Sequence, residues 1–256
     1  MSSSLPVITR VRHEIKRREL TVLRLDRLAP RMLRVVLGGA ELAQFTSLGF
    51  DDHVKLLFPG EDPTTPVMRD FTPRRYDAVS QELWIDFYLH DTGPAGTWSA
   101  QVKVGQKLTV AGPRGSAVIS LDGIDSHVLI GDETALPAIG RRLEELPDGV
   151  RALVVIESDG GSKGYPLQSR ASLEVVEVTR AAGQSTSPGK EIIARLRDLQ
   201  FPAGRCFTWV ATETQAARAI RRYLTDERGL DRHWIKAAGY WQRGKTGAHE
   251  VIQDEQ

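Results

Sequence analysis

The stretch HVLIGDETALPAIGRRLEELP (127–147) decides the fold, because the period of its hydrophobic residues changes partway along it. The first five residues form an apolar run of strand length that ends in a glycine. The apolar residues that follow recur every three or four positions, as in an amphipathic helix: Leu136, Ile139, Leu143 and Leu146. A strand, a glycine turn and a helix in this order indicate a parallel sheet covered by helices.

The same alternation continues to residue 241. Four further runs predict strands: RALVVIE (151–157), LEVVEV (173–178), CFTWVA (206–211) and RHWIKAAGYW (232–241). Two stretches between them predict helices: SPGKEIIARLRDL (187–199) and TETQAARAIRRYLTDERG (212–229). We therefore expect a doubly wound α/β domain over residues 123–256, with helices on both faces and a ligand beyond the carboxyl ends of its strands.

The first half of the chain has the two-residue period of strands. Short β-rich runs are separated by loops rich in Gly, Pro and Asp, and only one short helix is expected, at 95–101. The runs are LTVLRLDRL (20–28), MLRVVL (32–37), HVKLLF (53–58), LWIDFYL (83–89) and KLTVA (107–111), preceded by a basic first strand and arm at 10–20. Many short strands without intervening helices predict an antiparallel β-barrel over residues 1–122.

Composition excludes several classes of function. The 34 Lys and Arg residues nearly balance 33 Asp and Glu, so a net charge of +1 provides no field to attract nucleic acid or an anionic membrane. There is neither a membrane-length apolar run nor a hydrophobic signal core at the start. A single cysteine, Cys206, excludes a disulfide framework, and the six histidines lack zinc-like spacing. We expect a cytoplasmic protein without a protein-bound metal.

The segment RDFTPRRYD (69–77) concentrates arginines, an aromatic ring and a hydroxyl. In an extended segment Arg69 and Phe71 share one face, and Thr72 and Arg74 lie on the other. Two interpretations stay open from the residues alone. The segment is either a solvated charged turn, or a site for a flat aromatic ligand that carries phosphates, such as flavin adenine dinucleotide (FAD).

RDFTPR resembles the Arg-x-Tyr-Thr/Ser-x-Arg flavin motif of the ferredoxin–NADP reductase superfamily. The whole chain resembles the siderophore-interacting proteins, which are FAD-dependent ferric-siderophore reductases. The matching motifs run from end to end: DDHVKLLFP (51–59), MRDFTPRRYD (68–77), DFYLHDTGPAGTWS (86–99), AGPRGS (111–116), GDETALPAI (131–139) and GYWQRG (239–244). The resemblance implies bound FAD, electrons from NADPH or NADH, and a ferric siderophore as substrate. It implies no catalytic side chain, because the flavin carries the electrons.

The resemblance also implies roles for residues of the first half. Arg69 and Arg74 approach the flavin's phosphate and ring-proximal polar atoms, and Thr72 lies near its reactive nitrogen edge. Phe71 stands where the family has Tyr, so stacking is kept and the hydroxyl is lost. His90 lies beside the flavin, although a histidine at a strand end also suits a structural role. The turn at the pyrophosphate contains Gly96, Thr97 and Ser99.

In the second half, GDETALPAI implies a segment that lines the cleft where the nicotinamide approaches the flavin, with Asp132, Thr134 and Ala135. Asp132 and Thr134 are also suited to be simple helix N-caps. TETQAARAIRR (212–222) resembles the second nucleotide-side loop, with Thr212 where the family more often has Gly. Tyr240 or Trp241 covers the second flavin face, or else completes a core.

Basic residues in the motifs are implied to hold an anionic ferric siderophore, and each is alternatively a solvated surface charge: Lys55, Arg114, Arg243 and Lys245. Three alternatives stay open. One is the same reductase with a reduced ferredoxin, instead of a nucleotide, as electron donor. The second is a general flavin reductase, and the third is a flavin-free, non-catalytic siderophore-binding protein.

Overall fold

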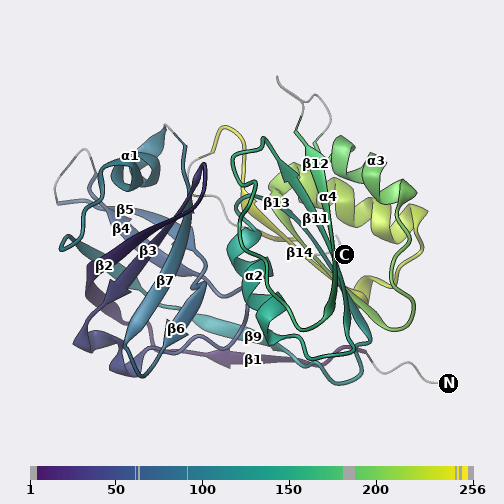
Figure 1. The fold of residues 1–256 in the computed structure, drawn as a ribbon, viewed down its shortest axis with the longest axis horizontal. Coiled ribbons are helices and arrows are strands. Elements are labelled where there is room, and N and C mark those ends of the chain that lie inside the picture. The colour runs from purple at the N-terminus through teal and green to yellow at the C-terminus, as the bar shows by residue number, and fades with distance from the viewer. Residues whose placement is uncertain are drawn as a thin grey trace. The chain divides into compact units, whose positions relative to one another are not determined.

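Two units divide the chain, and each has its own core. The computed structural model describes residues 5–60, 62, 64–90, 92–180, 188–245, 247 and 250–252 (Figure 1). The β unit comprises Ile8–Val118 together with the short segment Gly161–Pro166. The α/β unit comprises Ile119–Gly160, the chain from Leu167 onward and the stretch up to Val7. A domain boundary between residues 122 and 123 stays a prediction.

The β unit is built on a seven-stranded antiparallel sheet with the order β5-β4-β8-β2-β3-β7-β6. Its strands are β2 (Arg17–Ala29), β3 (Met32–Gly38), β4 (Val54–Phe58), β5 (Val67–Phe71), β6 (Arg75–Asp77), β7 (Glu82–Tyr88) and β8 (Lys107–Ala111). A second sheet pairs β1 (Ile8–Arg12) with β9 (Gly115–Ile119). The helices are the short 3₁₀ helix η1 (Ala40–Gln44) and α1 (Gly93–Gln101).

Alternate residues along these strands enclose one hydrophobic core, as the two-residue period predicts. The core takes every second residue of β7, namely Leu83, Ile85 and Phe87, and matching positions of β2, β3, β4 and β8. β3 is buried along its whole length, so its second face is covered as well. The antiparallel β architecture predicted for the first half is confirmed, and β5, β6 and β9 are additional strands that the sequence pattern did not reveal.

The α/β unit contains a six-stranded sheet with the order β12-β11-β10-β13-β14-β15. The first five strands are parallel and β15 is antiparallel to β14. The strands are β10 (Ser126–Asp132), β11 (Arg151–Ser158), β12 (Ser172–Thr179), β13 (Cys206–Glu213), β14 (Ile235–Trp241) and β15 (Glu250–Ile252). The helices are α2 (Leu136–Glu145), α3 (Lys190–Asp198), α4 (Thr214–Arg222) with a π turn at Tyr223–Glu227 (η2), and η3 (Arg232–Trp234).

Helices cover both faces of this sheet, so the predicted doubly wound fold is confirmed. Figure 1 shows α2 on one face and α3 and α4 on the other. Ile192 of α3 and Ile220 of α4 share a core with Val128 and Ile130 of β10. The strand order reverses between β10 and β13, the place where ligands of such sheets bind.

Gly131 explains how the chain turns from β10 toward α2. A Cβ atom at this position would lie 2.4 Å from the Ala135 Cβ and 2.6 Å from the Ala211 carbonyl oxygen. Only glycine permits such an approach, so the glycine after the apolar run is a packing requirement. No helix of the described residues is long and apolar enough to cross a membrane.

Candidate functional site

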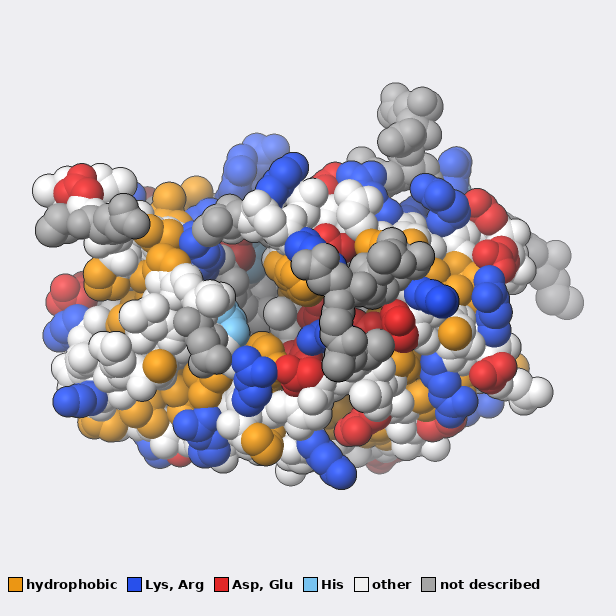
Figure 2. Space-filling view, turned by 90° about the horizontal axis from the view of Figure 1, so that it is seen from above, with side chains coloured by type: hydrophobic (Ala, Val, Ile, Leu, Met, Phe, Trp, Pro, Cys, Tyr) orange, Lys and Arg blue, Asp and Glu red, His pale blue; other side chains and the backbone are white. Residues whose placement is uncertain are grey.

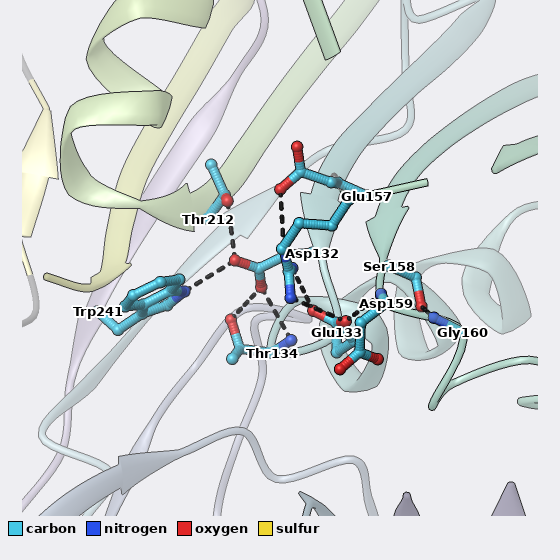
Figure 3. Close-up of polar contacts among 10 residues, drawn as sticks. Asp132, Glu133, Thr134, Glu157, Ser158, Asp159, Gly160, Thr212 and Trp241 are labelled. Atoms are coloured by element: carbon cyan, nitrogen blue, oxygen red, sulfur yellow. Dashed lines mark hydrogen bonds and ion pairs between the residues drawn. The ribbon is translucent and has the colours of Figure 1, made fainter. Parts of the chain in front are cut away.

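Four hydrogen bonds converge on the Asp132 carboxylate at the point where the strand order reverses (Figure 3). Its Oδ1 accepts from the Thr134 backbone N–H at 2.9 Å and from Thr134 Oγ1 at 2.5 Å. Its Oδ2 accepts from Thr212 Oγ1 and from Trp241 Nε1, each at 2.8 Å. Asp132 is 1% exposed. This carboxylate therefore ties together the carboxyl ends of β10, β13 and β14.

Asp132 and Thr134 do not cap α2 with their side chains. The N-cap residue of α2 is Ala135, and no side chain caps that helix. The Asp132 carboxylate instead forms a local turn with Thr134, in which a side chain imitates a backbone acceptor. Their expected place beside a nicotinamide stays a prediction, and the cap interpretation is wrong for both residues.

The two aromatic residues at the end of β14 have different surroundings. The Trp241 indole is held by its hydrogen bond to Asp132 and lines a cavity at the end of the sheet. The Tyr240 ring packs edge-on against Trp209, with ring centroids 5.9 Å apart. The Trp241 ring is therefore oriented by a polar contact at the site.

A second polar group lies beside Asp132 and was not found from the sequence. Arg180 bonds to both oxygens of Glu133, with Nη2 at 2.6 Å and Nη1 at 3.2 Å, and its Nε lies 3.2 Å from Glu157. Burial raises the pKa of Glu133 and the pKa of Glu157. The bonds to Arg180 lower both values, but by less, so both pKa values lie above the usual value for a glutamate. Burial alone would lower the pKa of Arg180, but its bonds to these acids raise it. All three residues lie at or just after strand ends, which is the only signal the sequence carries.

A cavity of about 280 Å³ opens at these strand ends. It brings together two guanidinium groups, three carboxylates and the Trp241 ring; its polar lining is Glu157, Arg180, Glu191, Thr212, Glu213, Gln215, Gln242 and Arg243. Glu213 caps α4, because its Oε2 accepts from the backbone N–H groups of Gln215 and Ala216 at 2.7 and 3.0 Å. The cavity is suited to a polar ligand that offers both hydroxyl and anionic groups.

In the β unit, the flavin motif begins on β5, which among the described residues pairs in the sheet with β4 alone. Phe71 lies opposite Val54 and Arg69 lies opposite Leu56, so both side chains face the core side of the sheet. This confirms that Arg69 and Phe71 share a face. The half-buried Phe71 ring packs on Phe87 with centroids 4.4 Å apart, so only part of the ring is available for stacking.

The next residues of the motif turn inward. Thr72 is 7% exposed and Arg74 is 3% exposed, while the Arg74 backbone N–H donates to the Trp84 carbonyl at 2.9 Å. The buried Arg74 side chain acts through its charge on Arg34 and Tyr165, both of which bind Asp86. Its contact with a flavin phosphate stays a prediction.

The start of α1 presents backbone N–H groups that have no partner within the helix itself. Gly93 begins the helix with a φ of +76°, which glycine adopts readily, and a Cβ there would meet no atom within 4 Å. The N-cap residue Thr92 makes no side-chain cap, and the first turn contains no acidic residue. Such an end favours an anion. Together with Arg69 and the partly exposed Phe71 ring, this donor set fits a flavin nucleotide.

The predicted residues around α1 are placed differently from one another. A Cβ on Gly96 would lie 2.2 Å from the His90 carbonyl oxygen, so glycine allows the helix to lie against that residue. The Ser99 hydroxyl is buried and donates to the Gly96 carbonyl at 3.0 Å, whereas His90 and Thr97 are exposed. His90 and Thr97 are therefore accessible to a ligand, and Ser99 is used within the helix.

The four basic candidates do not belong to one unit. Lys55 and Arg114 lie in the β unit, and Arg243 and Lys245 in the α/β unit. Lys55 Nζ pairs with Asp70 at 2.7 Å, but its side chain is 47% exposed, and such pairs contribute little. Arg114, Arg243 and Lys245 are exposed. On the face that Figure 2 shows, basic side chains are interspersed with acidic ones.

Two of the recognised motifs have a structural role that the sequence did not show. Asp52 of DDHVKLLFP accepts hydrogen bonds from Ser47 Oγ at 2.9 Å, from the Gly49 backbone N–H at 3.1 Å and from Ser116 Oγ at 2.6 Å. Ser116, the last residue of AGPRGS, is also 2.8 Å from His13 Nε2. These motifs therefore join a loop to β9 through a buried carboxylate.

Comparison with known proteins agrees with both halves of this arrangement. Residues 124–244 match the model of the siderophore-interacting protein family, and residues 21–66 and 61–117 match the siderophore-interacting FAD-binding domain. The NADPH-dependent ferric-chelate reductase of Escherichia coli is 38% identical over 91% of this chain and 95% of its own length. The ferric vibriobactin reductase ViuB of Vibrio cholerae is 29% identical over 93% and 96%.

Solved structures agree as well. The siderophore utilization protein from T. fusca has a TM-score of 0.85 and 36% identity, and the match covers 94% of this chain and 98% of that one. The ferredoxin reductase of carbazole 1,9a-dioxygenase, with a TM-score of 0.63 and 18% identity over 86% of this chain and 68% of that one, shares the fold. The chain belongs to the siderophore-interacting protein family.

Proposed function

We propose that this protein is an FAD-dependent reductase that reduces ferric siderophores with electrons from NADPH or NADH. The observation that carries the proposal is the 38% identity, over nearly the whole chain, to a protein named NADPH-dependent ferric-chelate reductase. The flavin-compatible donor set of the β unit and the cavity at the carboxyl ends of the α/β strands support it. The substrate is the chelated iron, so iron is not a resident cofactor.

The β unit would hold FAD. Phe71 would stack on the isoalloxazine with the exposed part of its ring, Arg69 would pair with a phosphate, and Thr72 would lie at the flavin edge. The N–H groups of the α1 start, with Gly96 and Thr97 in that helix and the exposed His90 before it, would face the pyrophosphate region. The buried Ser99 would support this turn through its hydrogen bond to the Gly96 carbonyl. When bound, FAD would supply the ability to accept two electrons as a hydride from the nucleotide and to pass them on one at a time.

The α/β unit would hold the nicotinamide nucleotide at its switch point. The Asp132 carboxylate already accepts four hydrogen bonds, so it acts by fixing Thr134, Thr212 and Trp241 rather than by moving a proton. Ala135 is the N-cap residue of α2, which follows. In this proposal Trp241 is the better candidate for the aromatic that covers the flavin, because a hydrogen bond sets the plane of its ring.

The basic residues would attract the substrate. Ferric complexes of catecholate siderophores carry negative charge. Four basic side chains would each add positive potential at the surface of the unit to which they belong: Lys55, Arg114, Arg243 and Lys245. Reduction releases the metal, because hard oxygen donors hold Fe(III) more strongly than Fe(II). We place the protein in the cytoplasm, where reduced nicotinamide nucleotides are available.

An anaerobic absorbance titration tests the proposal. The protein loaded with FAD is titrated separately with NADPH, NADH and a reduced ferredoxin, and a ferric siderophore is then added. We expect a nucleotide to bleach the visible flavin band and the siderophore to restore it. Bleaching by ferredoxin alone would assign the other donor, turnover of free flavin without preference for chelated iron would indicate a general flavin reductase, and a protein that never takes up FAD would contradict the proposal.

A further inference from the structure

The segment Gly161–Pro166 leaves the α/β unit between β11 and β12 and belongs to the β unit. It is fixed there at two points. The Gly161 carbonyl accepts from the Arg31 backbone N–H at 2.8 Å, and the Tyr165 hydroxyl donates to Asp86 Oδ2 at 2.5 Å. A Cβ on Gly161 would lie 2.7 Å from Arg31 Cδ and 3.0 Å from its Cβ, so this contact is close.

Tyr165 completes a buried polar cluster on the second face of β3 and β7. Arg34 and Asp86 are directly paired across these strands, and the guanidinium binds both carboxylate oxygens at 2.7 and 2.8 Å. The Asp86 side chain is fully buried and Tyr165 is 8% exposed. Burial and the Asp86 charge raise the pKa of Tyr165, so its hydroxyl keeps its proton and remains a donor.

The cluster extends to the flavin motif through Arg74. Arg74 is 3% exposed, and the Arg34 guanidinium lies over the Trp84 ring, 4.6 Å from its centroid, while the Trp84 carbonyl binds the Arg74 backbone N–H. Both arginines are therefore buried around Trp84, and the charge of Arg74 acts on Arg34 and on Tyr165. Like charges in such a place repel strongly unless a carboxylate is held in a set position. The Arg74 backbone is also bound to Trp84, two residues before Asp86 on β7. The position of Asp86 therefore affects the residue that ends the motif.

We propose that Tyr165 is a positioning residue for FAD binding, acting through Asp86 on Arg74 and the preceding residues Phe71 and Thr72. The inference rests on the proposed function, because it supposes that this segment contacts FAD. Tyr165 itself need not touch the cofactor. Without its hydroxyl, a buried carboxylate loses one donor and gains freedom to reorient, and the Arg74 segment follows.

The test compares the full-length protein with Tyr165→Phe as apoproteins titrated with FAD. Flavin fluorescence gives the Kd, and the visible circular dichroism of bound FAD reports the geometry of the ring site. Both are measured well below the unfolding temperature. We expect the Kd to rise about three- to tenfold, which corresponds to part of one hydrogen bond to a charged group. The dichroism should change, because the ring site is rearranged.

Two further variants separate positioning from stability. Tyr223→Phe removes a hydroxyl that accepts from Arg228 Nε at 3.2 Å in the α/β unit, and it should leave the Kd for FAD unchanged. Gly161→Ala displaces the other end of the segment without removing a side-chain donor, and it should raise the Kd as Tyr165→Phe does.

Each outcome has a defined meaning. A raised Kd and altered dichroism in Tyr165→Phe and Gly161→Ala, but not in Tyr223→Phe, supports the inference. A Tyr165→Phe variant with the Kd and dichroism of the unmodified protein overturns it, even if its melting temperature falls, because the hydroxyl would then only stabilise the fold. Failure of the unmodified protein to bind FAD overturns the proposed function itself.

Discussion

Two threonines on β13 provide a sharp test of the Asp132 site, because the same substitution should destabilise the fold at one position and not at the other. Thr208 and Thr212 are both buried. The Thr212 hydroxyl donates to the buried Asp132 carboxylate at 2.8 Å. The Thr208 hydroxyl has no hydrogen bond within the described part of the chain, and the nearby Cys206 thiol is only a weak partner. Replacement by valine keeps the shape and removes the oxygen.

The expected magnitudes follow from these contacts. A hydrogen bond to a charged group contributes about 1.5–3 kcal/mol, so Thr212→Val should lower the free energy of unfolding by about 2 kcal/mol. For a protein of this size that corresponds to a melting temperature lower by roughly 4–8 °C. Thr208→Val removes a buried hydroxyl whose near partner is only the weak Cys206 thiol, so it should be neutral or stabilise by up to about 1 kcal/mol.

Urea unfolding followed by tryptophan fluorescence measures both variants, and the α/β unit reports through Trp209, Trp234 and Trp241. The slope of the free energy against urea concentration should be unchanged, so that a shifted midpoint reports stability alone. Equal losses in the two variants, or a larger loss for Thr208→Val, would refute the account of Asp132 as an acceptor that organises the strand ends.

Four further predictions concern other sites. Burial, with the charge of Arg142, lowers the pKa of His127 to about 3, so the unfolded chain binds a proton that the folded chain excludes. The contribution of His127 to the free energy of unfolding is full above about pH 6.5 and falls by about 1.4 kcal/mol for each pH unit below that value. His127→Leu should therefore make the free energy of unfolding, measured with urea, fall less steeply between about pH 6 and 4. Asp86→Asn should cost about 3–5 kcal/mol by leaving a buried arginine without its carboxylate, and a loss below about 1 kcal/mol by calorimetry would contradict this. Phe71→Ala should weaken FAD binding in fluorescence titrations while Phe71→Tyr preserves it; equal affinities would exclude stacking. The KM for an anionic ferric siderophore should rise with salt, which screens charge beyond about 8–10 Å, more than the KM for a neutral one, and Lys55→Ala should reproduce part of that rise.

The α/β half was predictable because its hydrophobic pattern is strong. Buried parallel strands are nearly continuous apolar runs, and helices that cover them have a clear apolar face. The errors lie at strand ends. Glu213 was assigned to a helix beginning at 212, but it is the last residue of β13 and its side chain caps α4. An acid that ends a strand and caps the next helix has the sequence signature of both elements.

The strands that escaped prediction are short or lie at edges. β5 reads VMRDF, with two charged residues of five, and in the described part of the chain it pairs with β4 alone. β6 and β15 have three residues each. An edge strand need not be apolar on either face, because its charged side chains reach water and discourage pairing with other molecules. Such strands carry little hydrophobic periodicity for a sequence pattern to reveal.

Whether a contact of the site could be predicted depends on how far apart its residues lie in the sequence. Arg69 and Phe71 share a face as expected, because two residues on one strand are related by local geometry alone. The ion pair of Arg180 with Glu133 joins residues 47 positions apart, and the bond from Tyr165 to Asp86 joins residues 79 apart. These contacts depend on strand order and register, which no local pattern contains.

For Arg74, the motif and the structure give different information. The motif identifies it as a residue of the flavin segment, and the structure buries its side chain, where its charge acts on Arg34 and Tyr165. A buried arginine beside another guanidinium is stable only where a carboxylate is held in position, so its role in binding depends on residues outside the motif. Transferring only the motif to another barrel, without the partners on β3 and β7 and the segment that carries Tyr165, should therefore fail to produce a flavin site.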